Sequence, residues 1–554
     1  MAWLRRNPAV ALLGLAVVIS SALLLWLGTD LTYFQDSWAF LVERRGFSAG
    51  DFLRPHNEHI SVVPVAIQKL LLALFGMESD LSERIVLTAM LGAIAVLLFV
   101  YVRRRIGPWP ALIAAVSLLF LGPAWEVLLW PFEISLAGSV LCGLGALLVL
   151  ERDDPRGDLV ACALLAIAIG FSSLGIPFVV AATVDVLQRR RSRGWTRAYV
   201  PGVPTLLFLA WYAAYGRDAE SAASLGSVLH APVFVVEGIG ASLASILGLR
   251  ALAGGIESQQ RPYLGLLALA AIFALVVYLF ARRPDARGWL RDPAPGLWSA
   301  LAAMLAFWGL AGINDLPGRA PWASRYMHVG AIFLFLVAAN LLTRVSLGRR
   351  TLLAVAGVAA IAVALNLVPL LEGRDRLEQE TILARADLAA IEISRRTVEP
   401  DFELTTELAG TPSLIDVKAG SYLAAVDDHG SPAYTPTDLA VAPEAGRRWA
   451  DVVLAQALPV SIETRPGVRQ GGADGCVEGA GKLETHVRPG TTRIEATPGP
   501  PVALGLRRFA ATEFPVPLGT VAGSSMTLLR IPRDAFGRPW QLEAKAKQRV
   551  RVCR

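Results

Sequence analysis

Long apolar runs follow one another from the start of the chain to about residue 371. A helix needs about 20 consecutive apolar residues to cross the hydrocarbon core of a bilayer, and most of these runs approach that length. Only 18% of the residues are charged, whereas a typical soluble domain contains about 25%. The sequence therefore predicts an α-helical polytopic membrane protein.

Arginine clusters between the apolar runs indicate which loops face the cytoplasm. Arg5 and Arg6 precede an apolar run that is longer than a signal-peptide core and is not followed by an A-x-A site. This pattern predicts an uncleaved first span with a cytoplasmic N-terminus. We expect a multi-pass protein of the plasma (inner) membrane, with about 11 spans and an extracytoplasmic C-terminus. The predicted spans cover residues 8–28, 83–103, 108–122, 133–150, 158–171, 174–188, 198–215, 262–281, 297–313, 326–343 and 351–371.

Residues 60–76 form an apolar segment that is interrupted by Pro64, Gln68 and Lys69. If this segment crossed the membrane, the arginine cluster at residues 103–105 would lie outside, against the usual distribution of positive charge. We therefore expect an amphipathic helix that lies along the outer membrane interface.

Residues 231–253 are apolar but rich in Gly, Ser and Ala, and they include Glu237 and Arg250. A crossing here would reverse the next span and leave the arginines of residues 282–291 outside. We therefore expect a non-crossing outer helix or a re-entrant segment, and a further span is the alternative. Non-helical backbone at membrane depth is tolerated only where it faces protein or a wet cavity.

The composition changes after Leu371, where the long apolar runs end. Residues 374–397 predict a long charged amphipathic helix. From about residue 458, short alternating runs such as 491–496 and 525–531 predict a β-sandwich-like module. The predicted domains are a transmembrane domain at 1–371, an extracytoplasmic helical linker region at 372–457 and an extracytoplasmic β-rich module at 458–554.

The four cysteines fall into two classes. Cys142 and Cys162 lie in apolar runs and are expected to be inert. Cys476 and Cys553 lie in the polar C-terminal region, and they can form a disulfide if that region is outside the cell. Two cysteines without a CxxC or HxxxH pattern nearby do not indicate a metal site.

The chain lacks several patterns that mark common functions. The net charge of +6 comes largely from short clusters beside the spans, whereas nucleic-acid binders gather cations on one face. We therefore expect no nucleic-acid partner. The absence of GxGxxG, Walker, G-x-S-x-G and HExxH motifs disfavours nucleotide-dependent enzymes and serine hydrolases. A proton-coupled transporter is disfavoured because no paired charges lie mid-membrane in symmetric halves.

A polar loop follows the first span and contains the first candidate for chemistry, Asp36. Polar residues beside an apolar bundle are a default place to look for function. Tyr33 and Trp38 could shield Asp36 from water and raise its pKa, which would suit a general base at the mouth of a cavity. The alternative is that Asp36 caps a short helix over residues 37–45.

Four polar residues in a row, His56, Asn57, Glu58 and His59, precede the predicted interfacial helix. They could bind a divalent metal together with Asp36, orient a substrate hydroxyl, or cap the helix that starts at residue 60. Histidines three residues apart outside a helix do not define a metal geometry, so all three interpretations stay open.

A later outer loop brings arginine to the side of the membrane where it is usually scarce. The planar guanidinium groups of Arg319 and Arg325 suit a phosphate or pyrophosphate, and Tyr326 and His328 follow directly. The alternative is that these arginines reach to lipid headgroups. Glu126 and Glu133, in an aromatic-rich turn, are a second source of carboxylates.

The chain resembles the GT-C superfamily of membrane glycosyltransferases, which use polyprenyl-phosphate sugars. The shared features are a first span, an outer loop with an early acid at Asp36, and an interfacial helix before the second span. The Arg-Pro-His-Asn-Glu-His run at 54–59 is similar to one in uncharacterised bacterial members, and the loop at 324–326 and a soluble outer C-terminal domain also fit. Several members have an adjacent acidic pair where this chain has one acid, so a divalent metal stays an open possibility.

The resemblance implies an inverting hexosyl- or pentosyltransferase. It would move a sugar from a polyprenyl-phosphate donor to a cell-envelope glycan, lipid or protein acceptor on the outer face of the membrane. Asp36 would be the base and the arginines would hold the departing phosphate. The alternatives are a lipid or polysaccharide flippase or export component, and a non-catalytic scaffold. The expected substrate-binding residues are Trp38, His56, Asn57, Glu58, His59 and Glu133, and the expected phosphate-binding residues are Arg319, Arg325, Tyr326 and His328.

Overall fold

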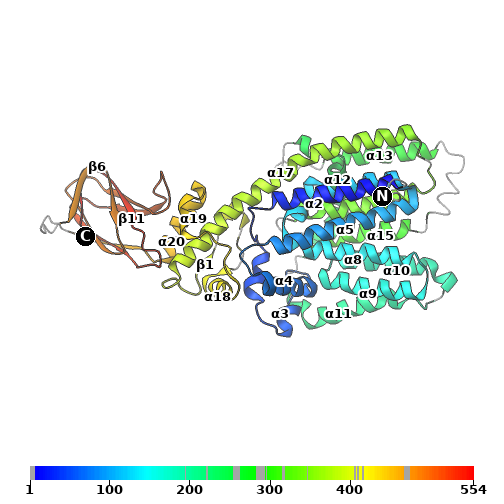
Figure 1. The fold of residues 1–554 in the computed structure, drawn as a ribbon, viewed down its shortest axis with the longest axis horizontal. Coiled ribbons are helices and arrows are strands. Elements are labelled where there is room, and N and C mark those ends of the chain that lie inside the picture. Colours follow the sequence, from blue (N-terminus) through cyan, green and yellow to red (C-terminus); the bar gives the residue numbers. More distant parts are fainter. Residues whose placement is uncertain are drawn as a thin grey trace. The chain divides into compact units, whose positions relative to one another are not determined.

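Two separately packed units make up the chain in the computed structural model (Figure 1). Unit 1 comprises Met1–Thr29, Gly46–Leu71 and Leu81–Arg376, and unit 2 comprises Asp30–Arg45, Leu72–Asp80 and Leu377–Arg554. The structure describes residues 7–553 except 194, 220–222, 254–262, 282–293, 295, 315–318, 346, 405–406, 409–410, 413, 415–416 and 467–474.

Unit 1 is a helical bundle whose apolar helices agree with the predicted membrane domain. Its first helix, α2 (Pro8–Leu27), starts with a proline at the position where a missing N–H has no cost. The next long helix, α5 (Leu81–Ile106), packs against α2, α6 and α8 and ends in three arginines. The other helices up to α16 are α3 (Ala49–Leu53), α4 (Val62–Phe75), α6 (Pro108–Leu119), α7 (Trp125–Leu129), α8 (Ile134–Leu150), α9 (Pro155–Phe171), α10 (Gly175–Arg193), α11 (Tyr199–Ala214), α12 (Leu225–Ile246), α13 (Tyr263–Ala281), α15 (Leu297–Ile313) and α16 (Ser324–Leu341).

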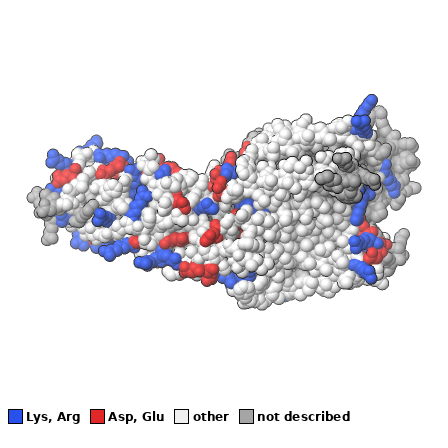
Figure 2. Space-filling view, viewed as in Figure 1, with Lys and Arg blue, Asp and Glu red and all other residues white. Residues whose placement is uncertain are grey.

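The surface of unit 1 has a broad band without charged side chains, and cations gather at one end of the bundle (Figure 2). Among the described residues, 6 helices are long and apolar enough to cross a membrane, or 7 if the bent pair α6 and Gly122–Leu129 forms one span. Several predicted spans appear as shorter apolar helices, including α11 and α15. The multi-pass membrane character is confirmed, and the total of eleven spans stays a prediction.

The difficult segment at 231–253 forms most of an unbroken helix, α12, which begins with a capping box at Ser224 and Ser227. The helix therefore does not have the broken backbone of a re-entrant segment, and its 22 residues would suffice to cross a membrane. It packs against α13, α15 and α16, and small residues permit close approach, since a Cβ on Gly240 would lie 3.1 Å from a side-chain carbon of Leu266. The arginines of 282–291 that entered the topology argument lie outside the described residues.

A single helix of 46 residues, α17 (Arg349–Ser394), combines the last predicted span with the predicted amphipathic helix. The sequence suggested a domain boundary at residue 371, but α17 continues through it, and the two units divide at Arg376 instead. Gly373 does not stop the helix. A Cβ there would lie 2.2 Å from Cγ of Trp125, so the glycine makes room for the indole of α7.

The helical part of unit 2 contains α18 (Ala419–His429), α19 (Pro436–Val441) and α20 (Glu444–Ala457). The segment after the first span packs here too, and Trp38 is 0% exposed in its core. The Trp38 ring meets Tyr33 and Tyr422 edge-on, with centroids 5.8 Å and 6.0 Å away. The expectation that Trp38 contacts substrate is therefore not supported, because its side chain fills the core of unit 2.

The β-rich part of unit 2 is a seven-stranded antiparallel sheet in the order β5-β10-β7-β11-β8-β9, with β6 also paired to β11. The long strand β11 pairs with β6 along most of its length, with β8 near its start and with β7 near its end, so the sheet branches there. This agrees with the predicted sheet-rich module. The strands are β5 (Ser461–Pro466), β6 (Cys476–Val487), β7 (Gly490–Ala496), β8 (Val502–Arg507), β9 (Val516–Val521), β10 (Ser525–Ile531) and β11 (Trp540–Cys553), and two small pairs precede them: β1 (Glu403–Leu404) with β4 (Val417–Lys418), and β2 (Glu407–Leu408) with β3 (Thr411–Pro412).

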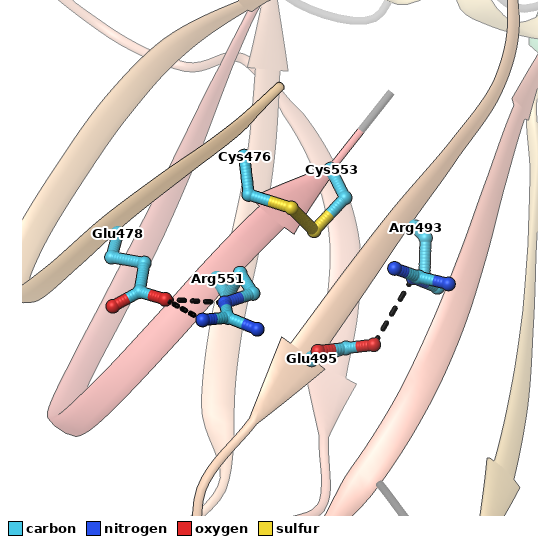
Figure 3. Close-up of a disulfide and its surroundings, with 6 residues drawn as sticks. All are labelled: Cys476, Glu478, Arg493, Glu495, Arg551 and Cys553. Atoms are coloured by element: carbon cyan, nitrogen blue, oxygen red, sulfur yellow. Dashed lines mark hydrogen bonds and ion pairs between the residues drawn. A yellow bond between two sulfur atoms is a disulfide. The ribbon is translucent and has the colours of Figure 1, made fainter. Parts of the chain in front are cut away.

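The two cysteines predicted to pair, Cys476 and Cys553, form a disulfide between the start of β6 and the end of β11 (Figure 3). They lie directly opposite each other in the register of these strands, with Cα atoms 4.1 Å apart. Cys142 and Cys162 are free, as expected for residues in apolar helices.

Candidate functional site

A polar cluster lies at one end of unit 1, and we define it as Glu58, His59, Glu126, Arg319 and Arg325. Its members come from the loop before α4, from α7 and from the segment around the start of α16. Arg319 and Glu58 are 261 positions apart in the sequence. The fold therefore assembles a charged site from segments that the sequence alone could only treat separately.

The loop that presents Glu58 is closed by two backbone hydrogen bonds. The His56 N–H donates to the carbonyl of His59 at 3.0 Å, and the His59 N–H donates to the carbonyl of His56 at 2.9 Å. Asn57 adopts a φ of 49°, in the left-handed region that asparagine tolerates better than most residues. Asn57 thus has a clear local role as a turn residue. The Glu58 carbonyl also accepts a hydrogen bond from Ser173 Oγ at 3.2 Å, which fixes the loop against the turn between α9 and α10.

The Glu58 carboxylate is held by Arg319 through two parallel hydrogen bonds. Arg319 Nη2 donates to Oε2 at 2.9 Å, and Nη1 donates to Oε1. His59 Nε2 lies 3.4 Å from the same Oε1. Burial alone would raise the pKa of Glu58, but the charge of His59 and the hydrogen bonds from Arg319 outweigh it and lower the pKa to about 2. Glu58 is therefore an anchored carboxylate and a weak general base.

Glu126 and Arg325 form the second half of the cluster at the start of α16. Glu126 Oε2 accepts a hydrogen bond from the Arg325 backbone N–H at 3.0 Å and lies 3.4 Å from Arg325 Nε. In return, the Glu126 N–H donates to Ser324 Oγ at 3.1 Å. A carboxylate at a helix N-terminus is favourable because the first N–H groups have no partner within the helix. Glu126, the weaker sequence candidate, thus orients Arg325.

Arg250 belongs to the same end of the bundle, although sequence analysis did not select it. Its Nη2 donates to the carbonyl of Trp322 at 2.9 Å, in the short segment between Arg319 and Arg325. Its Nη1 is buried without a hydrogen-bond partner, and within the described part of the chain Arg250 makes no ion pair. A lone arginine in the apolar segment 231–253 was the signal that could have identified it, since such residues are rarely kept without a function.

Aromatic side chains flank the loop of Glu58. The His56 ring lies 5.2 Å from the ring of Phe132, and Phe132 stacks on Trp130 at 5.1 Å between centroids. The Trp130 and Phe132 rings come from the turn between α7 and α8. Just before this turn, the carbonyl of Leu129 accepts a 2.6 Å hydrogen bond from Arg84 Nη1. His56 is therefore positioned by an aromatic pair rather than by a metal-type ligand set.

Three other candidate residues from the sequence have buried or half-buried side chains that pack within unit 1. His328 is 1% exposed inside the bundle, which does not support its predicted contact with phosphate. Tyr326 is half-buried, with its ring 6.0 Å from Trp308. Glu133 is buried at the end of the short helix Pro131–Glu133, away from the exposed position expected of a substrate contact. Burial explains each difference, because polar side chains near the ends of apolar helices are often used for packing.

Asp36, the predicted base, belongs to unit 2. It is half-buried in the turn that precedes the π-helix η1 (Ala39–Glu43). The structure thus brings Glu58, His59 and Arg319 into contact, joins Arg325 to Glu126, and assigns Asp36 to the other unit. The residue that caps η1 is Trp38, and its side chain makes no capping hydrogen bond.

The cluster does not offer a convincing metal site. Among the described residues, no group of three or more His, Cys, Asp or Glu side chains is arranged to hold a metal ion. Within the cluster, both carboxylate oxygens of Glu58 already accept hydrogen bonds from the cation Arg319. A positive guanidinium in that position opposes a divalent ion, so the donor set favours an anionic ligand nearby.

A pocket of about 330 Å³ opens at the other end of α5. Arg104 and Arg105 both pair with Glu151 there, at 2.7 Å each. Arg105 Nε also donates to Asn340 Oδ1 at 2.9 Å. Both arginines of this pocket therefore share one carboxylate partner, and the pocket belongs to the packing at this end of the bundle.

The fold and the cluster define a multi-pass helical membrane protein with a charged site at one end of its bundle and a disulfide-linked, sheet-rich region near its C-terminus. Its structure is similar to that of ArnT from Cupriavidus metallidurans bound to undecaprenyl phosphate, with 13% identity, a TM-score of 0.43, and coverage of 77% of this chain and 90% of that chain. No protein-family model and no curated protein matches the sequence.

Proposed function

We propose that this protein is a GT-C-type glycosyltransferase that moves a sugar from a polyprenyl-phosphate donor to a cell-envelope acceptor on the outer face of the membrane. The observation that carries the proposal is the buried guanidinium of Arg250, which has an unsatisfied donor beside the segment that contains Arg319 and Arg325. A buried cation is costly unless an anion compensates it, and a ligand phosphate would supply that anion.

The charge and polarity of this end of unit 1 suit an amphiphile. Three arginines, Arg250, Arg319 and Arg325, stand against two carboxylates, Glu58 and Glu126, so positive charge is in excess. The helices below them are long and apolar. A lipid phosphate combines an anionic head with an apolar tail. Its head would lie among the arginines and its tail along the apolar helices of the bundle.

The proposed reaction is a single displacement at the anomeric carbon of the donor sugar. Asp36 takes the proton of an acceptor hydroxyl, the acceptor oxygen forms a new bond to the anomeric carbon, and the bond from that carbon to the phosphate oxygen breaks. The electron pair leaves with the lipid phosphate, whose charge is stabilised by the arginines. Attack from the face opposite the leaving group inverts the anomeric configuration.

Glu58 has a different part in this proposal. A carboxylate with a pKa of about 2 takes protons poorly, so Glu58 acts through Arg319 by holding its guanidinium in one orientation. His56 and His59, on the same closed loop, are proposed to contact the sugar or the acceptor. Asp36 remains the proposed base.

The test is transfer of radiolabelled sugar from polyprenyl-phosphate donors in membranes that contain the wild type, Asp36→Asn or Arg250→Gln. We expect each variant to lose roughly 100-fold or more of the transfer rate, a typical effect of removing a general base or a charge-stabilising donor. The matched controls are Asp218→Asn and Arg217→Gln, two exposed residues of the short helix Gly216–Asp218, which should keep full activity.

Thermal unfolding of each purified variant separates loss of function from loss of fold. Transfer that persists in a folded Asp36→Asn variant would remove Asp36 from the reaction. Absence of transfer by the wild type with all polyprenyl-phosphate sugars, combined with movement of the lipid between leaflets in vesicles, would replace the transferase by the flippase alternative.

A further inference from the structure

The outer face of β11 carries a row of cations, Lys545, Lys547, Arg549 and Arg551, which we call the β11 stripe. Alternate residues of a strand point to the same side of a sheet. The residues between them point inward, and Val550 and Val552 are buried in the core of unit 2. In agreement with this alternation, Lys545, Lys547 and Arg549 are exposed and Arg551 is half-buried.

The middle of the stripe lies at an irregularity in the strand pairing. Ala546 pairs with Gly481 of β6, whereas Val550 pairs with Gly479, so β11 contains extra residues between these two positions. Lys547 and Arg549 lie in this bulge, and both are exposed. No ion pair in the described structure involves either of them. Their positive charges are thus available to a ligand.

The two outer members of the stripe are partly neutralised. Lys545 Nζ lies 2.9 Å from Glu543, and Arg551 pairs with Glu478 (Figure 3). Cations still outnumber anions on this face of the sheet. In addition to the stripe, the register of the described strands places on this face the cations Arg465, Lys482, Arg493, Arg507 and Arg530 and the anions Glu463, Glu478, Glu484, Glu495 and Glu543.

An aromatic ring lies at one end of the stripe. The guanidinium carbon of Arg507 is 4.4 Å from the ring centroid of Phe514, and Lys482 Nζ is 5.9 Å from it. Lys482 is directly opposite Lys545 in the register of β6 and β11. At the other end of the stripe, the disulfide between Cys476 and Cys553 joins the two strands beside Arg551. The disulfide therefore links β6 and β11 covalently at this end of the stripe.

We propose that the β11 stripe is a docking surface for a linear anionic polysaccharide, one that carries carboxylate or phosphate groups along its length. Lys545 and Arg551 lie opposite Lys482 and Glu478, which are four positions apart on β6, so the stripe extends over roughly 13 Å. A row of cations matches a chain that carries repeated negative charges, and the ring of Phe514 offers an apolar face to a sugar. The proposal does not depend on the transferase activity.

An anionic lipid surface fits the stripe less well. Binding to a bilayer surface usually combines cations with large apolar side chains that insert between headgroups. Within the described strands and turns from β5 to β11, the exposed large apolar side chains are Val477 and Phe536, and neither belongs to the stripe. Figure 2 shows both blue and red side chains on the sheet-rich part of unit 2.

The experiment measures binding of fluorescent polygalacturonate to the full-length protein in nanodiscs of neutral lipid, with dextran as the uncharged control. Replacing Lys547 and Arg549 together with glutamine should weaken binding about tenfold or more, because the two cations of the stripe without an ion pair in the described structure are then lost. The matched control is Arg465→Gln with Arg530→Gln, which removes the same charge from β5 and β10, where both arginines pair with Glu463.

We expect the control to change affinity less than twofold, a difference within ordinary surface effects, and we expect rising salt to weaken wild-type binding. Equal weakening in both double variants would show that only net charge matters and would overturn the proposal. So would equal binding of dextran, or no binding of polygalacturonate at low salt. Binding to anionic vesicles without binding to polygalacturonate would assign the stripe to lipid instead. Unchanged thermal unfolding shows that both variants are folded.

Discussion

Glu58 and Arg319, 261 positions apart, are joined by two hydrogen bonds at one end of the helical bundle, one of them 2.9 Å long. The Glu58 side chain is 25% exposed and that of Arg319 is 15% exposed, so the pair is largely removed from water. A bidentate contact of this kind gives the guanidinium a defined plane as well as a neutralising charge. It therefore fixes the direction in which the remaining donors of Arg319 can point.

Removing one partner of this pair should destabilise unit 1 and lower activity. We expect Glu58→Gln and Arg319→Gln each to cost roughly 1–3 kcal/mol, because each leaves a partly buried charge without its partner. In a double-mutant cycle, the combined variant should lose clearly less than the sum of the two. Thermal unfolding in detergent provides the values. Additive losses would mean that the contact contributes nothing to stability.

The pH dependence of stability follows from the lowered pKa of Glu58. Its pKa falls from 4.5 to about 2 in the folded protein, so the folded state favours the ionised form. The stabilisation is present in full above about pH 4.5 and is lost as the pH falls toward 2. Melting temperatures of the wild type and Glu58→Gln between pH 3 and 7 should therefore differ most at the neutral end. A difference that stays constant over this range would contradict the assignment.

The disulfide should stabilise the sheet-rich part of unit 2. Cys476 and Cys553 are 77 positions apart, and a cross-link over a loop of that length typically contributes about 2–4 kcal/mol. We expect Cys476→Ser, or treatment with a reductant, to lower the unfolding temperature of unit 2. Mass spectrometry of a non-reduced digest checks the link itself. If protein that was produced in an oxidising compartment yields peptides with both cysteines as free thiols, the disulfide is refuted.

A fully buried ion pair, Arg508 with Asp534, should be essential to the fold of unit 2. Both side chains are 0% exposed, and Arg508 Nη1 lies 2.8 Å from Asp534. Arg508→Met should cost about 3–5 kcal/mol, because it leaves a buried carboxylate unpaired. The control is Arg448→Met, whose exposed pair with Glu513 should contribute under about 1 kcal/mol. Denaturant unfolding monitored by limited proteolysis compares the two, and equal losses would contradict this argument.

Much of the helical architecture follows from local patterns. The predicted span at 297–313 coincides with α15, and 198–215 differs from α11 by one residue at each end. Apolar runs that must satisfy all their backbone hydrogen bonds in lipid have few options other than helices. The helix at 62–75 was also expected. The continuity of α17 across residue 371 was not expected. A change in composition does not end a helix when the residues on both sides of the change are compatible with helical backbone.

The contacts within the candidate site could not be predicted from local patterns in the sequence. Glu58 and Arg319 were both selected from the sequence, as separate candidates, but their contact was not. Trp38 and His328 looked like accessible polar or aromatic candidates, yet both are buried. In the sequence, Arg250 entered only the argument about whether residues 231–253 cross the membrane. Its contact with the carbonyl of Trp322 assigns it to the same end of the bundle as Arg319 and Arg325.

The sequence by itself determined the membrane-spanning character, the helical and sheet-rich regions and the residues that could carry charge at the ends of the helices. These follow from hydrophobic periodicity and composition, which act over a few turns of helix or a few residues of strand. Only the tertiary structure decided which of those charges meet, which candidates are buried, and that the segment with Asp36 packs with unit 2. Such contacts join residues hundreds of positions apart, and they depend on the packing of the whole unit rather than on any local pattern.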